Sequence, residues 1–336
     1  MRDVAIVSFA RQVELHAEVD EVEMLAPCIT QALAAAKVDR REVGVTVSGS
    51  CDYLGGRPFS FVTALDAVGA WPPIRESHVE MDGAWALYEA WVALQHGDID
   101  VALVYAFGKS TQGSLYDVLA AQLDPYCVAP LGVDARSLAA LQARAMLDAG
   151  VCTERDMAAV AARAQGGDAD RMLDAPYVAS PLRGHDCGPP ADAVAAVVLV
   201  AGDRARASCE HPAFIRGIDH RIEPHALGAR DLTQSPSLVI AASKTGLASR
   251  PVDVAEIDAP FSHQELLVRR ALGLDGGVWV NPSGGSLAAW PYIVSGLLRI
   301  GEAASQIHAG KAFRALGHAT SGPCLQQNLL CVMEAG

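Results

Sequence analysis

Two carboxylates precede an apolar helix that the sequence predicts from Gly83. The turn reads Glu80-Met81-Asp82-Gly83 and leads into the helix and then a buried strand. A helix N-terminus stabilises negative charge because its first N–H groups lack partners inside the helix. We therefore predict that Asp82 caps this helix. For Glu80 three roles stay open: a part in chemistry, an ion pair with an arginine, or a second cap.

Further reactive side chains lie near the C-terminus and in one glycine-rich loop. His318 and Cys324 fall between two predicted strands, where each is either a proton-transfer or nucleophilic group or an inert interior side chain. Cys51 lies in a glycine-rich run with Tyr53 and Arg57. We expect this run to form the wall of a substrate pocket.

The composition is that of a compact protein with a large core. Of the 336 residues, 51% are hydrophobic and 19% charged, which argues against long disorder. The net charge of -13 at pH 7 disfavours nucleic acid and anionic membranes as partners. The N-terminal apolar run is too short for a secretory signal, and no run is long enough to cross a bilayer, so we expect a cytoplasmic location.

Cysteine and glycine spacing argue against the common metal and nucleotide sites. Eight cysteines are scattered without a Cys-x-x-Cys pair, which is typical of reduced thiols. The glycine-rich segments lack the contexts of dinucleotide-binding and P-loop motifs. We expect no metal and no bound cofactor.

The order of predicted elements repeats between residues 1–202 and residues 203–336, which we predict to be two halves of an α/β fold. Each half contains a helix that begins with glycine, at Gly83 and Gly296, and its short apolar strands are typical of sheets covered on both faces. Residues 110–186 are predicted to form a loop-rich and helical insert over the active face. The repeated elements are strand Asp3–Phe9, helix Glu21–Ala36 and strand Val43–Ser48 in the first half, and strand Ala213–Asp219, a helix from Leu238 and strand Val252–Ile257 in the second.

Three motifs together resemble the thiolase superfamily. They are the Gly83 helix with its following strand, the run Asp253–Phe261, and Asn-Pro-Ser-Gly-Gly at Asn281–Gly285. Their order and spacing are similar to those of sterol-carrier-type thiolases and lipid-transfer proteins over nearly the whole chain. The resemblance implies a five-layer α/β/α/β/α sandwich built from two duplicated halves.

The chain departs from that family at each catalytic motif. The nucleophilic cysteine is replaced by Glu80, the activating histidine by Trp290, the functional residue of the C-terminal loop by Gly322, and the Asn-Glu-x-Phe asparagine by Asp258. Claisen condensation and thiolysis require a thiolate and a second base. We therefore expect no covalent acyl-enzyme.

Relatives in this branch are implied to be retro-aldolases, which split a β-hydroxyacyl-CoA of a sterol-like acid into a ketone and a shorter acyl-CoA. By this resemblance Asp258, removed from water, is the predicted base, and Tyr292 the predicted donor to the oxyanion. Gly285, Trp290 and Gly322 are predicted to border the substrate, whose coenzyme A is the only cofactor expected.

Two other functions remain open. One is an acyltransferase that uses Cys324 or Cys51 as a relocated nucleophile, and the other is a non-catalytic subunit that binds acyl-CoA. The resemblance also implies a homodimer and a small partner protein with an OB-fold and a zinc ribbon.

Overall fold

The computed structural model describes residues 2–274 and 276–336. The strands are β1 (Val4–Glu14), β2 (Val45–Gly49), β3 (Glu76–Val79), β4 (Val101–Lys109), β5 (Tyr177–Ala179), β6 (Leu182–Arg183), β7 (Asp192–Ala201), β8 (Ala213–Ile222), β9 (Val254–Glu256), β10 (Trp279–Val280), β11 (Arg314–Ser321) and β12 (Gln327–Ala335).

The helices include seven of nine residues or more within the described chain: α1 (Glu21–Ala35), α4 (Gly83–His96), α6 (Ala135–Asp148), α7 (Glu154–Gln165), α10 (Pro236–Lys244), α11 (Ser262–Leu272) and α13 (Ser295–His308). The shorter α-helices are α2 (Asp52–Gly55), α3 (Leu65–Val68), α5 (Leu115–Ala121), α8 (Ala169–Met172), α9 (Arg204–Ser208) and α12 (Gly285–Ala288). The 3-10 turns are η1 (Arg40–Glu42), η2 (Ser60–Ala64), η3 (Ala129–Leu131), η4 (Gly184–Asp186), η5 (Leu227–Ala229) and η6 (Leu247–Ser249).

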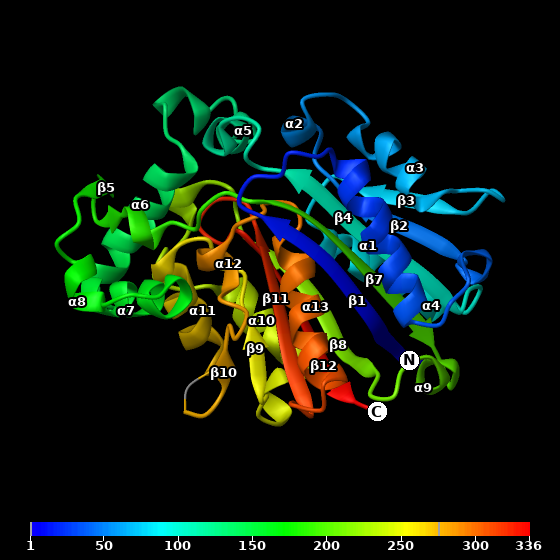
Figure 1. The fold of residues 1–336 in the computed structure, drawn as a ribbon. Coiled ribbons are helices and arrows are strands. Elements are labelled where there is room, and N and C mark those ends of the chain that lie inside the picture. Colours follow the sequence, from blue (N-terminus) through cyan, green and yellow to red (C-terminus); the bar gives the residue numbers. More distant parts are fainter. Residues whose placement is uncertain (1, 275) are drawn as a thin grey trace.

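The main sheet is mixed and has ten strands in the order β10-β9-β11-β12-β8-β1-β7-β4-β2-β3. From its edge of the sheet toward the middle, each half places its strands in the same order: the third, second, fourth, fifth and first of that half along the chain. The predicted repeat is therefore present in the topology. Pairing of Ala5 with Phe214 and of Ile6 with Ala213 joins β1 to β8, so that the strands of both halves form one continuous sheet. The five-layer arrangement stays a prediction. The mixed α/β class is confirmed (Figure 1). The boundary between residues 202 and 203 stays a prediction.

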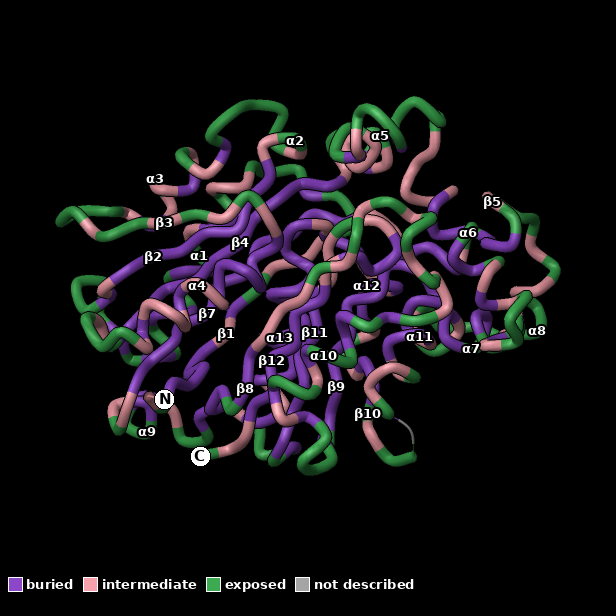
Figure 2. The backbone as a smooth tube through the Cα atoms, turned by 180° about the vertical axis from the view of Figure 1, so that it is seen from behind, coloured by how far each residue is buried: buried purple, intermediate pink, exposed green. Residues whose placement is uncertain are grey.

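The sheet is covered on both faces, as the apolar strands predicted. Along β1, Val4 and Ile6 belong to a central cluster that also contains residues of α4, α13 and strands of both halves. Their neighbours Ala5 and Val7 point to the other face and pack with α1. A third cluster joins α10 and α11 to the strands of the second half. Figure 2 shows most of the central strands buried and many of the connecting loops exposed.

The segment between β4 and β7 carries α5 to α8 on one side of the molecule (Figure 1). Its local signals act as predicted: the Thr153 side chain accepts the Asp156 N–H, and the Asp156 carboxylate accepts the Thr153 N–H, which is a capping box at the start of α7. Contacts of α7 with α11 attach the segment to the second half.

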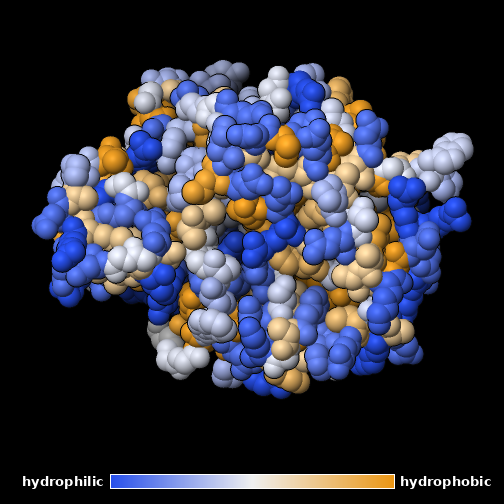
Figure 3. Space-filling view, viewed as in Figure 1, coloured by the Kyte–Doolittle hydropathy of each residue, from blue (hydrophilic) through white to orange (hydrophobic). Residues whose placement is uncertain are grey.

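The surface is predominantly polar on the face drawn in Figure 3, where apolar side chains lie in small groups between hydrophilic ones. None of the helices in the described part of the chain combines the length and the hydrophobicity that crossing a membrane requires.

Candidate active site

The N-termini of two buried helices meet at Asp82. The Oδ1 atom accepts the N–H of Ala84 at 2.8 Å and that of Leu297 at 3.0 Å, and Oδ2 accepts the N–H of Gly296 at 2.8 Å. The first bond confirms the predicted cap of α4. The other two come from α13, the matching helix of the second half. Glycine at position 296 is required because a Cβ there would lie 2.6 Å from Asp82 Oδ1.

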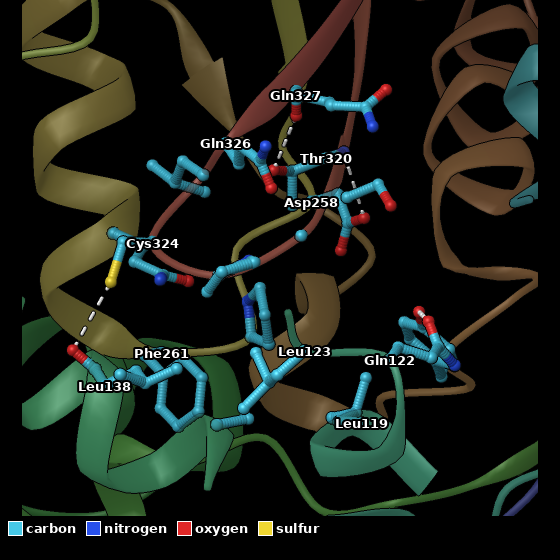
Figure 4. A pocket seen from close by; sticks show the side chains of 18 of the residues that line it. Leu119, Gln122, Leu123, Leu138, Asp258, Phe261, Thr320, Cys324, Gln326 and Gln327 are labelled. Carbon is cyan, nitrogen blue, oxygen red and sulfur yellow. Dashed lines mark hydrogen bonds between the residues drawn. The ribbon is translucent and has the colours of Figure 1, made fainter. Parts of the chain in front are cut away.

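Two adjoining cavities open beside these helix ends. The first cavity, about 390 Å³, is lined by Glu80, Asp258, Trp290, Tyr292, Gly322 and Cys324 among others. The second cavity, about 490 Å³, is lined by Cys51, Tyr53 and Asp82, and it shares Glu80, Gln122 and Tyr292 with the first. The fold therefore brings most of the predicted site residues together from segments that are distant in sequence. Figure 4 shows Asp258 and Thr320 on one side of the first cavity and Cys324 with Leu138 on another.

Asp258 follows β9 and is only 2% exposed. Its Oδ1 accepts hydrogen bonds from Ser286 Oγ at 2.6 Å and from Ser295 Oγ at 2.7 Å. Its Oδ2 accepts a long bond of 3.4 Å from the Thr320 N–H. One carboxylate oxygen is thus fully bonded within the protein, and the other retains capacity to accept a further proton donor.

Tyr292 supplies a hydroxyl to the region that both cavities share. The hydroxyl donates to Gln122 Oε1 at 2.9 Å. Burial raises the pKa of Tyr292, so that the hydroxyl stays protonated and can donate at neutral pH. The Trp290 ring packs edge-on against Phe261 and against Tyr292, with ring centroids 6.0 and 6.2 Å apart. Trp290 therefore forms an aromatic wall of the first cavity.

Glu80 has an exposed side chain that borders both cavities. Its Oε1 accepts the N–H of Asp52 at the start of α2. No arginine of residues 2–274 or 276–336 forms an ion pair with it, and the cap of α4 is Asp82 instead. Burial, and next the charge of Asp258, raise the pKa of Asp82 well above its ordinary value, against the opposing effect of its three N–H donors.

The thiols near the cavities are held in the protonated form. Burial raises the pKa of Cys324 to about 12, and its Sγ donates to the Leu138 carbonyl at 3.3 Å. Burial and the charge of Glu80 raise the pKa of Cys51 to about 11. Because the thiolate is the nucleophile, neither cysteine is activated for attack near neutrality.

Three predicted site residues lie away from both cavities. His318 is enclosed in β11, where its Nε2 pairs with Asn328 Oδ1 at 3.0 Å and burial lowers its pKa. Arg57 donates to Thr63 Oγ1 at 3.2 Å. Gly285 has a φ of +65° and forms part of the turn that leads to Ser286. None of the three lines either cavity, and their roles toward a substrate stay predictions.

The polar residues of the site that were not predicted include Ser286, Ser295, Gln122 and Thr320. Ser286 had a local signal, since it follows the Asn281–Gly285 motif directly. The others come from elements whose approach depends on the tertiary fold. No group of three or more histidine, cysteine, aspartate or glutamate side chains in the described ranges has the arrangement of a metal site.

Comparison with known proteins places this geometry in a known fold. No family model matches the chain. An acetyl-CoA acetyltransferase of Methanothermobacter thermautotrophicus is 29% identical over 167 residues, which cover 42% of this chain and 44% of that protein. The match thus spans less than half of the relative. The solved Ltp2-ChsH2(DUF35) aldolase superposes with a TM-score of 0.80 and 18% identity, covering 99% of this chain and 98% of that chain.

The chain has a thiolase-like fold. The superposition extends over both halves, and the partial sequence match to an acetyl-CoA acetyltransferase agrees with it. In this thiolase-like chain, the turn before α4 carries a carboxylate at Glu80, and the thiols that border the cavities are Cys51 and Cys324.

Proposed function

We propose that this chain is a lyase that cleaves the Cα–Cβ bond of a β-hydroxyacyl-CoA by a retro-aldol reaction, without a covalent acyl-enzyme. The observation that carries the proposal is the Asp258 carboxylate at the wall of the first cavity, bonded through Oδ1 to two serines and open at Oδ2. The likeness of the fold to an aldolase supports it.

The reaction needs a base and an oxyanion donor. Asp258 Oδ2 takes the proton of the β-hydroxyl, and the carbon–oxygen bond becomes a carbonyl as the Cα–Cβ bond breaks. The electron pair passes to the thioester as an enolate, whose oxygen accepts a hydrogen bond from Tyr292 when that hydroxyl turns from Gln122 to the substrate. The proton on Asp258 then returns to Cα, so that a ketone and a shorter acyl-CoA leave and no group remains on the protein.

Acyl transfer is the second candidate, because the partial relative is an acetyltransferase. It would require Cys324 or Cys51 as nucleophile. The raised pKa of both thiols argues against it, since thiolate is scarce at neutral pH. A non-catalytic acyl-CoA-binding subunit is the third candidate, and it predicts no turnover under any condition.

Part of the lining of the first cavity supports the proposed substrate class. Leu119, Leu123, Leu138 and Phe261 form an apolar side of this cavity. Clefts of this size enclose drug-sized ligands, which contact apolar side chains and a few polar groups. We propose a bulky sterol-like or lipid acyl group in the first cavity, with the coenzyme A arm reaching it through the second.

The assembly is also a proposal. The similar structure is described by two protein names together, Ltp2 and ChsH2(DUF35). We propose that this chain acts as a homodimer with a small OB-fold and zinc-ribbon partner. Light scattering of the chain alone and mixed with such a partner measures both stoichiometries.

The test is ketone release from steroid-type β-hydroxyacyl-CoAs, with wild type and Asp258→Asn compared in the presence of the partner. Asparagine keeps the shape of the side chain but cannot take the proton, so kcat should fall by about 10³-fold. The affinity for the CoA ester, measured by calorimetry, should stay within about threefold. Full activity of Asp258→Asn would end the lyase proposal, and absence of turnover in wild type with its partner would favour the non-catalytic subunit.

A further inference from the structure

Two serine hydroxyls converge on a single oxygen of Asp258. Ser286 Oγ and Ser295 Oγ lie 2.6 and 2.7 Å from Oδ1 and 2.9 Å from each other. Both serines are at most 1% exposed. Each hydroxyl has one proton, and a charged acceptor is the stronger partner, so both protons are directed to Asp258.

The Asn281–Gly285 motif positions the first of these hydroxyls, that of Ser286. Gly284 and Gly285 have φ values of +93° and +65°, and a Cβ at Gly285 would lie 2.6 Å from Asn281 Nδ2. Asn281 Oδ1 accepts the Ile257 N–H, which binds the turn to the segment that carries Asp258. Ser286 is the next residue, and the turn therefore fixes where its hydroxyl lies.

The start of α13 positions the second hydroxyl, that of Ser295. Ser295 is the first residue of this helix, and the N–H groups of Gly296 and Leu297 are held by Asp82. The cap that joins the two central helices thus also fixes Ser295 against Asp258.

We propose that Ser286 and Ser295 are positioning residues for the proposed base. They saturate Oδ1 and prevent rotation of the carboxylate, so that Oδ2 remains directed to the β-hydroxyl of the substrate. The role of the glycine-containing Asn281–Gly285 motif in this protein is to hold Ser286 against Asp258. The inference rests on the proposed function in one respect, namely that Asp258 is the base.

The test compares Ser286→Ala, Ser295→Ala and the double variant with wild type. Each single change removes one hydrogen bond to a charged group, and we expect kcat to fall about 10-fold in each and about 100-fold in the double variant, with KM within about twofold. Ser8→Ala is the matched control. It removes a buried hydroxyl of β1 that donates to the Ala32 carbonyl at 2.7 Å, and Ser8 borders neither cavity.

A purely structural role predicts a different result. Ser8→Ala and Ser286→Ala should both lower the melting temperature, since each removes a buried hydrogen bond, but only Ser286→Ala should lower kcat. A double variant with kcat within threefold of wild type, or an equal loss of kcat in the control, overturns the inference.

A further readout separates positioning from simple loss of stability. Infrared difference spectra with isotope-labelled aspartate test the contact without turnover. We expect a shift of one carboxylate band in Ser286→Ala that is absent when Asp258→Asn is also present. If wild type releases no ketone, the proposed function fails, and this band alone decides whether the serines hold Asp258. If ketone is released but the band does not shift, the positioning inference fails and the lyase proposal stands.

Discussion

At the residue scale, the proposed cleavage divides its proton tasks between Asp258 and Tyr292. The carboxylate has an oxygen free to accept, and the tyrosine hydroxyl stays protonated because burial raises its pKa. Neither task needs a thiolate. The buried thiols, which remain protonated, are compatible with this division and unsuited to acyl transfer.

Replacement of the tyrosine tests the oxyanion role. Tyr292→Phe should lower kcat by about 10²-fold with little change in KM, because one donor to the developing charge is lost. Steady-state kinetics measure this. In wild type the raised pKa means that activity should not fall through ionisation of this hydroxyl below pH about 10. The matched control is Tyr105→Phe in β4, which borders neither cavity and should keep wild-type kcat; similar losses in both variants would contradict the assignment.

Thiol reactivity tests the protonation state of the cysteines. At pH 7.5 iodoacetamide should label the exposed Cys127 first and leave Cys51 and Cys324 largely unmodified. The labelling rate of Cys51 should rise about tenfold per pH unit up to pH about 11, because its raised pKa keeps it neutral at lower pH. Peptide mass spectrometry reads out each site. Rapid labelling of Cys51 or Cys324 at pH 7.5 would contradict this prediction and support the acyltransferase hypothesis.

Most of the residues that the sequence singled out border the cavities, because motifs mark their positions. Asp258, Tyr292 and Cys324 belong to such runs, and all three line the first cavity. For His318 the sequence left a chemical and an interior role open, because a position next to a motif does not say which face of a strand a side chain occupies; in the structure it is buried within β11. Ser295 could not be found, since its contact depends on the packing of α13 against the segment after β9.

At the element scale, Asp82 couples the starts of α4 and α13. This one carboxylate caps the N-termini of both helices by accepting three backbone N–H groups. The sequence predicted the local cap, because Asp82 immediately precedes Gly83. It could not predict the distant one, which lies more than 200 positions along the chain and forms only when the two halves pack together.

Removal of this carboxylate should destabilise the protein more than removal of an ordinary cap. We expect Asp82→Ala to lower the free energy of unfolding by about 2–4 kcal/mol, the sum of two caps. Asp20→Ala, which removes the exposed cap of α1 alone, should cost about 1 kcal/mol. Urea unfolding followed by circular dichroism measures both. Equal costs for the two variants would argue against the double cap.

At the scale of the whole molecule, the two halves share one sheet and one central core. The strand pattern of each half was predictable from its apolar runs, because strands covered on both faces lack polar alternation. The pairing of β1 with β8 was not predictable, since the register of two strands from different halves depends on how the halves meet. The same interface places Asp82, Asp258 and Ser295 next to one another.

A continuous sheet predicts that the halves unfold together. In denaturant near the midpoint, pulsed hydrogen exchange should label peptides of β4 and β11 in a single cooperative step, because both strands contribute to the central cluster. Mass spectrometry of the labelled peptides separates the populations. Labelling of one half while the other stays protected would mean that residues 1–202 and 203–336 fold independently.

The central claim is carbon–carbon cleavage without a bond between substrate and protein, and one measurement tests it most directly. The chain with its partner is incubated with a steroid-type β-hydroxyacyl-CoA, and the products and the intact protein are analysed by mass spectrometry at successive times. The account predicts a ketone and a shorter acyl-CoA in equal amounts, with no added mass on the protein at any time. An acyl adduct on Cys51 or Cys324 that forms and decays with turnover would contradict it.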